Sequence, residues 1–331
     1  MRPAQICERN RTCVRFLLYN TFCEVAVLDR PEAGQALDAV IAEAEAVQQL
    51  LDAYDPESEL SRLNVQASSG LRTPISENLF ALLLTLLRSG EASGGRFDIT
   101  VGSLLRLWNF TAGEPRKPRK TDITGATRGY RHVSLDGVSR TAQFLRDGLS
   151  LDCGAAGKGY AAGRIASRLQ AMGVGRATIN LGGNLHLLGS GPHAGKWRVG
   201  VQQPWARRGE TAGILMLDGD VSVSTSGGYD RYFTQGGQVW HHLLDPATGE
   251  PARSNRTSCT VVSRDALAAD VLSTVLFVGG PDCFIRTASS VWPKADAGYV
   301  LANGTEIELS ENVKGRFEAM NLPLLGDFNW C

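Results

Sequence analysis

The sequence predicts an α+β fold in which helices pack on largely antiparallel sheets, and two observations lead to this prediction. The second half of the 331-residue chain alternates short β-rich runs with glycine-marked turns, as antiparallel strands with tight connections do. Longer segments with apolar residues at spacings of three and four interrupt these runs, which is typical of helices that bury one face. The length allows either one elaborate domain or two domains of ~150 residues each.

The composition excludes several classes of protein. A hydrophobic content of 43% is too high for a disordered chain, and a charged content of 21% is too high for an integral membrane protein. The longest apolar stretches, such as residues 79–87, are shorter than the ~20 residues that a membrane-spanning helix needs. Lys and Arg together number 34, as do Asp and Glu, so we expect no nucleic-acid partner, and an anionic ligand needs a local site.

The cysteines and the first residues of the chain indicate in which cellular compartment the protein is expected. The seven cysteines form no C-x-x-C pair and do not cluster with histidine, which favours scattered reduced thiols over a zinc site or a disulfide framework. Residues 1–15 carry four arginines but no apolar run that could serve in a signal peptide. We therefore expect a cytoplasmic protein, or a periplasmic or membrane-anchored one if the true start differs.

In the first half, residues 16–28 form a β-rich run broken in its middle, which predicts two strands or one bulged strand. Pro31 can open a helix whose apolar stripe extends to Tyr54. Residues 58–64 are expected to form a polar turn, and a second, leucine-rich helix is expected over residues 76–91.

Residues 114–131 contain two prolines and six basic residues without an apolar period, which predicts a surface loop. Charge runs usually face water, so a solvated insertion is the simpler interpretation. The alternative is a docking patch for an acidic partner protein. A hairpin is expected next, around Asp136 and Gly137.

The second half is predicted to hold two helices and a series of strands. The helices are expected over residues 157–172 and 265–278, and the strands over residues 178–181, 185–188, 197–201, 214–217, 221–224 and 257–262.

Residues 151–160 contain the end of a strand, a glycine-rich turn and the start of a helix. Amide groups at a helix N-terminus carry partial positive charge, and Lys158 adds a full one, so the segment suits a phosphate. It lacks the spacing of a P-loop, because only two residues separate Gly154 from Gly157 and Lys158. A tight turn that caps a helix fits these residues equally well.

Asp270 and Thr274 lie four residues apart in the predicted helix over residues 265–278 and therefore share a face. A carboxylate and a hydroxyl are hard oxygen ligands of the kind that Mg²⁺ accepts. A solvated Asp beside a Thr bonded to its own helix backbone is the ordinary alternative. The apolar residues around Asp270 make this alternative less favourable, since an Asp in such a helix is costly to bury without a partner.

Two loops at strand ends, residues 224–232 and 241–249, supply hydroxyls, an arginine and two imidazoles. His242 is a candidate general base because imidazole titrates near neutral pH. Residues 245–249 would also make a plain turn, and adjacent histidines are more often structural.

The order and spacing of these segments resemble the ApbE family of FAD:protein FMN transferases. The family's D-x-G-x-x-A-K-G-Y element is similar to residues 152–160, and its L-G-G-[DN] element to residues 181–184. Its T-S-G-x-Y, H-x-x-D-P-x-T-G and A-D-x-x-x-T elements are similar to residues 225–229, 242–249 and 269–274. Two further family segments resemble residues 58–64 and 97–102, so the resemblance extends from about Phe16 to about Gly280.

The chain departs from the family pattern at three places. Tyr19-Asn20-Thr21 stands where the family commonly has Met-Gly-Thr, Gly157 replaces an Ala before Lys158, and Ile99 replaces a Pro. The first departure requires Asn20 to permit the close backbone approach that a glycine allows.

The resemblance implies an ApbE-like, T-fold-related single domain around an FAD cleft, over residues 14–331 after an N-terminal extension of residues 1–13. It implies that the protein binds FAD and Mg²⁺, cleaves FAD and attaches FMN by a phosphoester bond to a Thr or Ser hydroxyl of an acceptor flavoprotein, releasing AMP. The resemblance implies an acceptor that is either a subunit of a respiratory redox complex or a soluble reductase with a short flavinylation motif containing Ser or Thr.

The resemblance also implies roles for single residues. Mg²⁺ would be held by the Gly157 carbonyl, Asp270 and Thr274, and Lys158 would contact the diphosphate. His242 would be the base, with Asp245 a candidate orienter. Further FAD contacts would come from Tyr54, Ser58, Glu59, Asn64, Asp98, Thr100, Gly182, Gly183, Asn184, Thr225, Ser226 and Gly227.

Two other functions remain open for such a site. Water in place of the acceptor hydroxyl would make the protein a Mg²⁺-dependent FAD pyrophosphatase. A flavin-binding protein without turnover is the second alternative, and the intact Asp270 and Thr274 pair argues against it.

Overall fold

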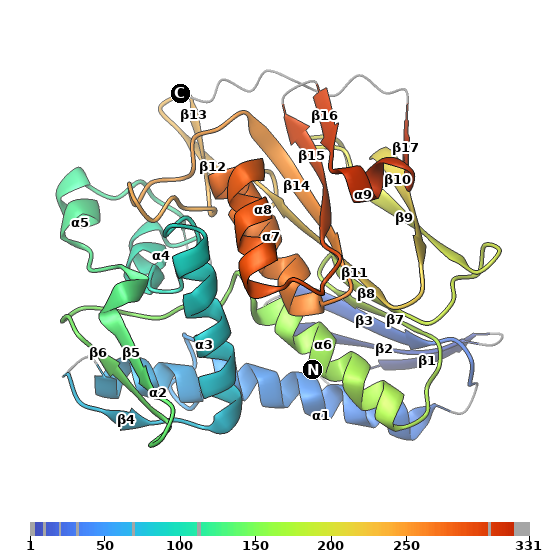
Figure 1. The fold of residues 1–331 in the computed structure, drawn as a ribbon, viewed down its shortest axis with the longest axis horizontal. Helices are drawn as coiled ribbons and strands as arrows, with labels where there is room; N and C mark the ends of the chain where they lie inside the picture. Colours follow the sequence, from blue (N-terminus) through green and yellow to red (C-terminus); the bar gives the residue numbers. More distant parts are fainter. Residues whose placement is uncertain are drawn as a thin grey trace.

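A nine-stranded sheet forms the centre of the protein in the computed structural model, which describes residues 4–8, 11–19, 21–30, 33–67, 70–110, 114–303 and 306–320 (Figure 1). Every pair of neighbouring strands in it is antiparallel, which confirms the predicted α+β fold. In spatial order the strands are β1 (Ala4–Glu8), β2 (Arg11–Leu18), β3 (Thr21–Val27), β7 (Ala177–Leu181), β8 (Asn184–Leu188), β11 (Val221–Gly227), β14 (Arg256–Ser263), β15 (Gly298–Asn303) and β16 (Glu306–Leu309).

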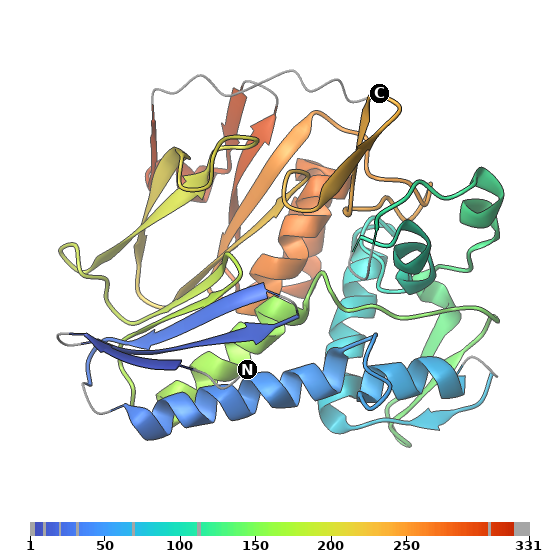
Figure 2. The same ribbon diagram turned by 180° about the vertical axis from the view of Figure 1, so that it is seen from behind.

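Helices cover one face of this sheet, and a smaller sheet covers the other. The helices are α1 (Gly34–Leu51), α6 (Gly157–Ala171), α7 (Ala266–Gly279) and α8 (Pro281–Val291), and they enclose the main core, seen from both sides in Figures 1 and 2. The smaller sheet joins β9 (Lys196–Gln202), β10 (Thr211–Asp218) and β17 (Phe317–Ala319), with α9 (Glu311–Lys314) nearby. It forms a second core with residues such as Val221 and Val223 of β11.

A third group of elements lies at the side of the sheet, at the left of Figure 1. It contains α2 (Glu59–Ala67), α3 (Glu77–Ala92), α4 (Gly102–Trp108), α5 (Lys120–Gly125), the 3-10 turn η1 (Tyr130–His132) and a small sheet of β4 (Thr73–Pro74), β6 (Thr141–Phe144) and β5 (Val133–Asp136). A hairpin of β12 (Tyr232–Gln235) and β13 (Gln238–His241) packs Trp240 against Trp108 and Ile123 of this group. Residues far apart in the sequence thus meet beside the sheet.

Two sequence predictions are wrong. Residues 58–64 do not form a polar turn, because α2 begins at Glu59, Ser58 Oγ accepts the Ser61 N–H at 3.0 Å, and Leu60 and Leu63 are buried. Residues 114–131 are not loop throughout, since they include α5, whose Ile123 is buried. Both helices are short, so their few apolar residues give little periodicity.

The other predicted elements are found close to their expected places. The run over residues 16–28 is two strands, β2 and β3, and the hairpin around Asp136 is β5 and β6. Asn20 and Pro31 lie outside the described residues, and α1 ends at Leu51, before Tyr54. The cysteines whose side chains the structure describes are free and buried: Cys13, Cys23, Cys153, Cys259 and Cys283.

Helices α6 and α7 approach each other closely at Gly159. A Cβ at this position would lie 2.4 Å from the Ala266 carbonyl oxygen and 2.6 Å from Asp270 Cβ, both far inside contact distance. One helical turn later, a Cβ at Gly163 would meet only Ala266 Cβ, at an ordinary 3.8 Å. Gly159 therefore sets the distance between the two helices.

We predict that Gly159→Ala lowers the free energy of unfolding by about 1–3 kcal/mol, because the added methyl group forces the helices apart. The matched control Gly163→Ala should be neutral or stabilising by up to about 1 kcal/mol, since alanine favours a helix. Urea unfolding of the two variants checks both values. Equal effects at the two positions would contradict this account of the helix contact.

Candidate active site

Strand β11 presents a row of hydroxyl groups to helix α7. Ser222, Ser224 and Ser226 alternate with the valines of the second core, so they point to the opposite face of the sheet. Ser224 Oγ donates to Asp270 Oδ1 at 3.0 Å. Ser226 Oγ lies 2.8 Å from Ser273 Oγ and 3.3 Å from Thr274 Oγ1. The strand and the helix thus meet through oxygen atoms.

Asp270 is the buried carboxylate of this contact, with 6% of its surface exposed. Its Oδ2 accepts the Gly159 N–H at 2.7 Å, so the first turn of α6 also holds it. Burial raises the pKa of Asp270, while the positive charge of Lys158 and the donated hydrogen bonds act in the opposite direction. The structure therefore places Asp270, Thr274 and the start of α6 together.

The oxygen-rich surroundings of Asp270 fit a hard divalent cation. Asn184 is buried; its amide Nδ2 donates to Ser224 Oγ at 3.2 Å, and its Oδ1 is a buried acceptor without a hydrogen-bond partner in the described chain. The described residues contain no group of three or more His, Cys, Asp or Glu that could hold a metal. A cation here would need ligand and water oxygens beside Asp270 and Thr274, which is how Mg²⁺ is commonly held.

Lys158, in the first turn of α6, is the charge around which the other parts of the site gather. Burial raises the pKa of Asp270 on α7, of Asp230 after β11 and of Cys23 on β3, and the charge of Lys158 opposes that rise in all three. In His242 after β13, the charge of Lys158 adds to the lowering of the pKa by burial. Charge effects of this kind require proximity. Four segments distant in the sequence therefore converge on one lysine.

His242 is half-buried and fixed by the backbone of Arg231. The Arg231 carbonyl oxygen accepts the His242 N–H at 3.1 Å and lies 3.2 Å from His242 Nδ1. A carbonyl can only accept, so Nδ1 carries the proton and Nε2 keeps a free lone pair. Burial, and then the charges of His241, Arg231 and Lys158, lower the pKa of His242 to about 3. The imidazole is therefore neutral at pH 7.

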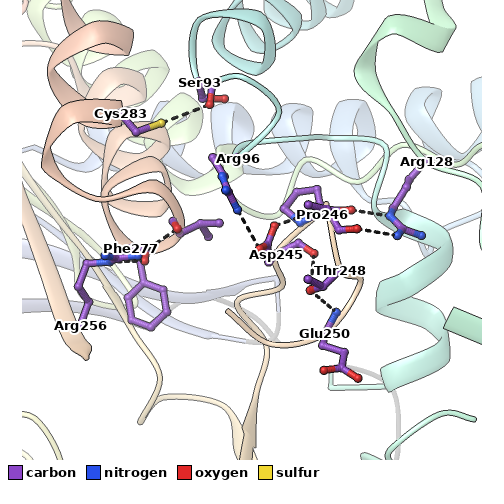
Figure 3. A network of polar contacts seen from close by, with 12 residues as sticks. Ser93, Arg96, Arg128, Asp245, Pro246, Thr248, Glu250, Arg256, Phe277 and Cys283 are labelled. Carbon is purple, nitrogen blue, oxygen red and sulfur yellow. Dashed lines mark hydrogen bonds and ion pairs between the residues drawn. The ribbon is translucent and has the colours of Figure 1, made fainter. Parts of the chain in front are cut away.

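Asp245 does not bond to His242 in the structure. Its Oδ2 forms an ion pair with Arg96 at 2.9 Å, and its Oδ1 accepts the Ala247 N–H at 2.9 Å (Figure 3). Arg128 donates to the carbonyl oxygens of Pro246 and Ala247 on the same turn. Two arginines thus hold the loop that follows His242, and no local signal in the sequence indicates this pairing.

Gly182 and Gly183 form the two-residue turn between β7 and β8, with φ values of 64° and 94°. A Cβ at Gly182 would lie 2.4 Å from Thr21 Oγ1, so this turn needs glycine for its conformation and its space. Thr225 faces away from α7, with its Oγ1 2.8 Å from Thr260 Oγ1. Gly227 ends β11, where a Cβ would meet the Tyr229 ring at 2.5 Å.

Three of the four predicted FAD contacts before residue 65 make structural bonds. Ser58 caps α2, Glu59 Oε1 accepts the Ser76 N–H at 2.6 Å, and the Asn64 amide bonds both backbone groups of Leu151, at 2.9 and 2.7 Å. Tyr54 differs, because it is 45% exposed and its side chain hydrogen-bonds Asp152, at the start of the glycine-rich segment. Tyr54 is therefore the member of this set that can meet a ligand.

Asp98 and Thr100 hold the segment before β5. Asp98 Oδ1 accepts the N–H and the hydroxyl of Thr100, at 2.8 and 2.6 Å, and Oδ2 accepts the Tyr130 N–H at 3.0 Å. Thr100 Oγ1 in turn accepts the Gly129 N–H at 2.7 Å. Asp98 lines a nearby cavity, and the side-chain oxygens of both residues are already used in these hydrogen bonds.

The sequence profile of the ApbE family matches residues 19–297 of this chain. The chain belongs to the ApbE family. This confirms the resemblance seen in the motifs, and the ApbE fold explains why they converge. Within the described residues, no helix is long and apolar enough to cross a membrane.

Several relatives are FAD:protein FMN transferases. The chain is 34% identical over 277 residues to the one from Klebsiella pneumoniae (strain 342), covering 82% of this chain and 84% of that one. It is 30% identical over 291 residues to the one from Escherichia coli (strain K12), covering 85% and 82%. Among solved structures, the ApbE protein of Thermotoga maritima has a TM-score of 0.80 at 28% identity, covering 95% of this chain and 99% of that one.

His241, beside the candidate base, gives the site a pH-dependent stability. It is 1% exposed, its ring packs edge-on against Phe277 at 5.4 Å, and burial lowers its pKa to about 4. An unfolded histidine titrates near pH 6.5, so between these values the unfolded chain binds a proton that the folded chain does not. Stability contributed by neutral His241 is present above pH 6.5 and is lost as the pH falls toward 4.

We predict that lowering the pH from 7 to 5 costs the wild type about 2 kcal/mol more in free energy of unfolding than it costs His241→Asn. Asparagine does not titrate but can still accept the Leu243 N–H, which bonds His241 Nδ1 at 3.2 Å. Urea unfolding of both proteins at the two pH values measures the difference. Parallel losses would show that His241 does not contribute.

Proposed function

We propose that this chain is an FAD:protein FMN transferase that cleaves FAD, joins FMN by a phosphoester bond to a Thr or Ser hydroxyl of an acceptor flavoprotein and releases AMP. The observation that supports it best is the convergence of Lys158, Asp270 and His242 from three segments of the chain. These residues supply a cation for a diphosphate, a carboxylate for a metal ion and a neutral imidazole. Membership of the ApbE family supports the same conclusion.

Mg²⁺ fits the residues around Asp270, and we propose that Asp270, Thr274 and the Gly157 carbonyl hold it. When bound, the ion neutralises charge on the phosphate oxygens. Among the described residues, none of full positive charge is in direct contact with buried Asp270, and burial raises its pKa, so its carboxylate gains from a cation brought with the substrate.

FAD would lie across the start of α6. Lys158 and the partial positive charge at the start of that helix suit its diphosphate, since both favour negative charge. The N–H groups of Gly157 and Gly159 already donate, to the Cys153 carbonyl oxygen and to Asp270 Oδ2. We propose that the turn of Gly182 and Gly183 and the end of β11 lie against the rest of the phosphates or the flavin, and that exposed Tyr54 lies at the adenine end. The remaining proposed contacts to FAD are those of Asn184, Thr225, Ser226 and Gly227.

His242 is proposed to take the proton of the acceptor hydroxyl at Nε2, the atom that the Arg231 carbonyl leaves free. Its low pKa reflects two neighbouring cations as well as burial. A bound diphosphate would offset these charges and raise the pKa, making the imidazole a stronger base when substrate is present. Asp245 is proposed to act on this base through its own loop, which its ion pair with Arg96 holds in place.

A Mg²⁺-dependent FAD pyrophosphatase is the second candidate, because His242 is only half-buried and is thus partly accessible to solvent. One assay separates the functions: FAD, Mg²⁺ and candidate acceptors with a Ser or Thr flavinylation motif, respiratory redox-complex subunits among them, are incubated with the chain. AMP together with covalent flavin fluorescence on the acceptor supports transfer. AMP alone supports the pyrophosphatase, and neither product supports a protein that only binds flavin.

We predict that Asp270→Asn lowers the rate of AMP release at least about 100-fold, because the charge that holds the metal is removed. Its free energy of unfolding should not fall by more than about 1 kcal/mol, since burial already disfavours the charged form. Asp282→Asn, an exposed acid on α8, is the matched control and should keep full activity. AMP release across a Mg²⁺ titration, with urea unfolding, measures both effects. A rate within threefold of wild type would refute the metal assignment.

We predict that His242→Ala lowers FMN transfer to an acceptor by a factor of about 10²–10⁴, the usual contribution of a general base. FAD affinity, measured by quenching of flavin fluorescence, should change little, since the proposed role concerns the acceptor proton. His193→Ala, at an exposed loop histidine, serves as the control. Full transfer by His242→Ala would remove His242 from the mechanism.

A further inference from the structure

An open cavity of 510 Å³ lies beside the loop that follows His242. Its walls come from the turn after α3, from residues 124–131, from Arg146 and from Pro246 and Ala247. We propose that this cavity, here called the arginine pocket, docks an acidic segment of the acceptor protein. The proposal rests on the proposed transfer function and adds a docking site for the partner.

Positive charge dominates the arginine pocket. Arg131 and Arg146 are exposed and form no ion pair or hydrogen bond with any described residue, although the Arg131 guanidinium lies 5.0 Å from the centre of the Tyr130 ring. Arg128 donates to the carbonyl oxygens of Ile123, Ala126, Pro246 and Ala247, and its charge acts on the carboxyl of Asp98. Asp98 is the acid of the lining, and its oxygens already accept three hydrogen bonds from Thr100 and Tyr130. The pocket therefore offers free guanidinium groups to carboxylates.

The arginine pocket lies within reach of the proposed base. Pro246, in its wall, is four residues from His242, so their Cα atoms are at most about 14 Å apart. Arg128 ties this wall to the pocket by bonding the carbonyl oxygens of Pro246 and Ala247, and the Ala247 contact measures 3.1 Å. An acceptor with acidic side chains about four extended residues from its Ser or Thr could occupy both places at once.

The pocket is distinct from the proposed diphosphate site. The cation that acts on Asp98 is Arg128, whereas the cation that acts on Asp270 is Lys158. The described lining of the arginine pocket includes neither Lys158 nor Asp270, and it holds Asp98, Thr124 and Thr127 beside its three arginines. A partner held through surface arginines would gain both orientation and encounter rate from this charge.

The test uses a fluorescein-labelled hexa-aspartate peptide and the full chain. We expect the peptide to bind the wild type at ~20 mM salt, with an affinity that falls as the salt concentration rises. The Arg131→Gln, Arg146→Gln double variant should bind the peptide at least about 10-fold less tightly. The matched control removes the same charge at two exposed arginines elsewhere, with Arg168→Gln on α6 and Arg198→Gln on β9, and should change the affinity less than twofold. A hexa-asparagine peptide should not bind.

Each other outcome overturns the proposal. If the wild type does not bind hexa-aspartate, or if both double variants lose affinity for this peptide equally, no specific pocket exists. If the pocket variant instead loses affinity for FAD, the arginines belong to the FAD site. Failure of the transfer function would appear separately, as absence of AMP release from FAD without any change in peptide binding.

Discussion

The buried carboxylate of Asp270 is the constraint on which the site depends. An isolated carboxylate is expensive to bury, so it must be met by donors from every side. Here the donors come from the Gly159 amide and the Ser224 hydroxyl, and Lys158 supplies the nearby charge. These contacts require α6 to lie directly on α7, which is why residue 159 has no room for a side chain. The position of one functional group thereby fixes how two helices pack on the sheet.

The central sheet can carry a polar row without losing its core because strands alternate their faces. On β11 the valines at 221 and 223 pack in the core with the smaller sheet, while Ser224 and Ser226 bond residues of α7 on the opposite face. Each hydroxyl has a partner: Ser222 bonds His186 at 2.7 Å, and Ser226 bonds Ser273. A single strand thus separates an apolar layer from an oxygen-lined one.

The sequence predicts what depends on neighbours along the chain and misses what depends on distant ones. The apolar periods of α1 and α7 and the four-residue spacing of Asp270 and Thr274 are local, so they could be predicted. The motifs also bring Lys158 and His242 into one site through the family pattern. In contrast, the pairing of Arg96 with Asp245 joins residues 149 positions apart, and nothing in either segment specifies it. The sequence does not predict the helix over residues 59–67, because Glu59, Ser61 and Arg62 outnumber its two buried leucines.

In the free protein, the environment of His242 disfavours protonation of the imidazole, and an anionic substrate would change that environment. Lys158, Arg231 and burial all disfavour a proton on the imidazole, so the ring stays neutral with its lone pair at Nε2. The same cations attract an anionic substrate, whose charge would weaken their effect on the ring. Proton affinity at His242 would then rise only when a diphosphate occupies the site. In the proposed mechanism, the base and the substrate would thereby be coupled through shared electrostatics rather than through direct contact.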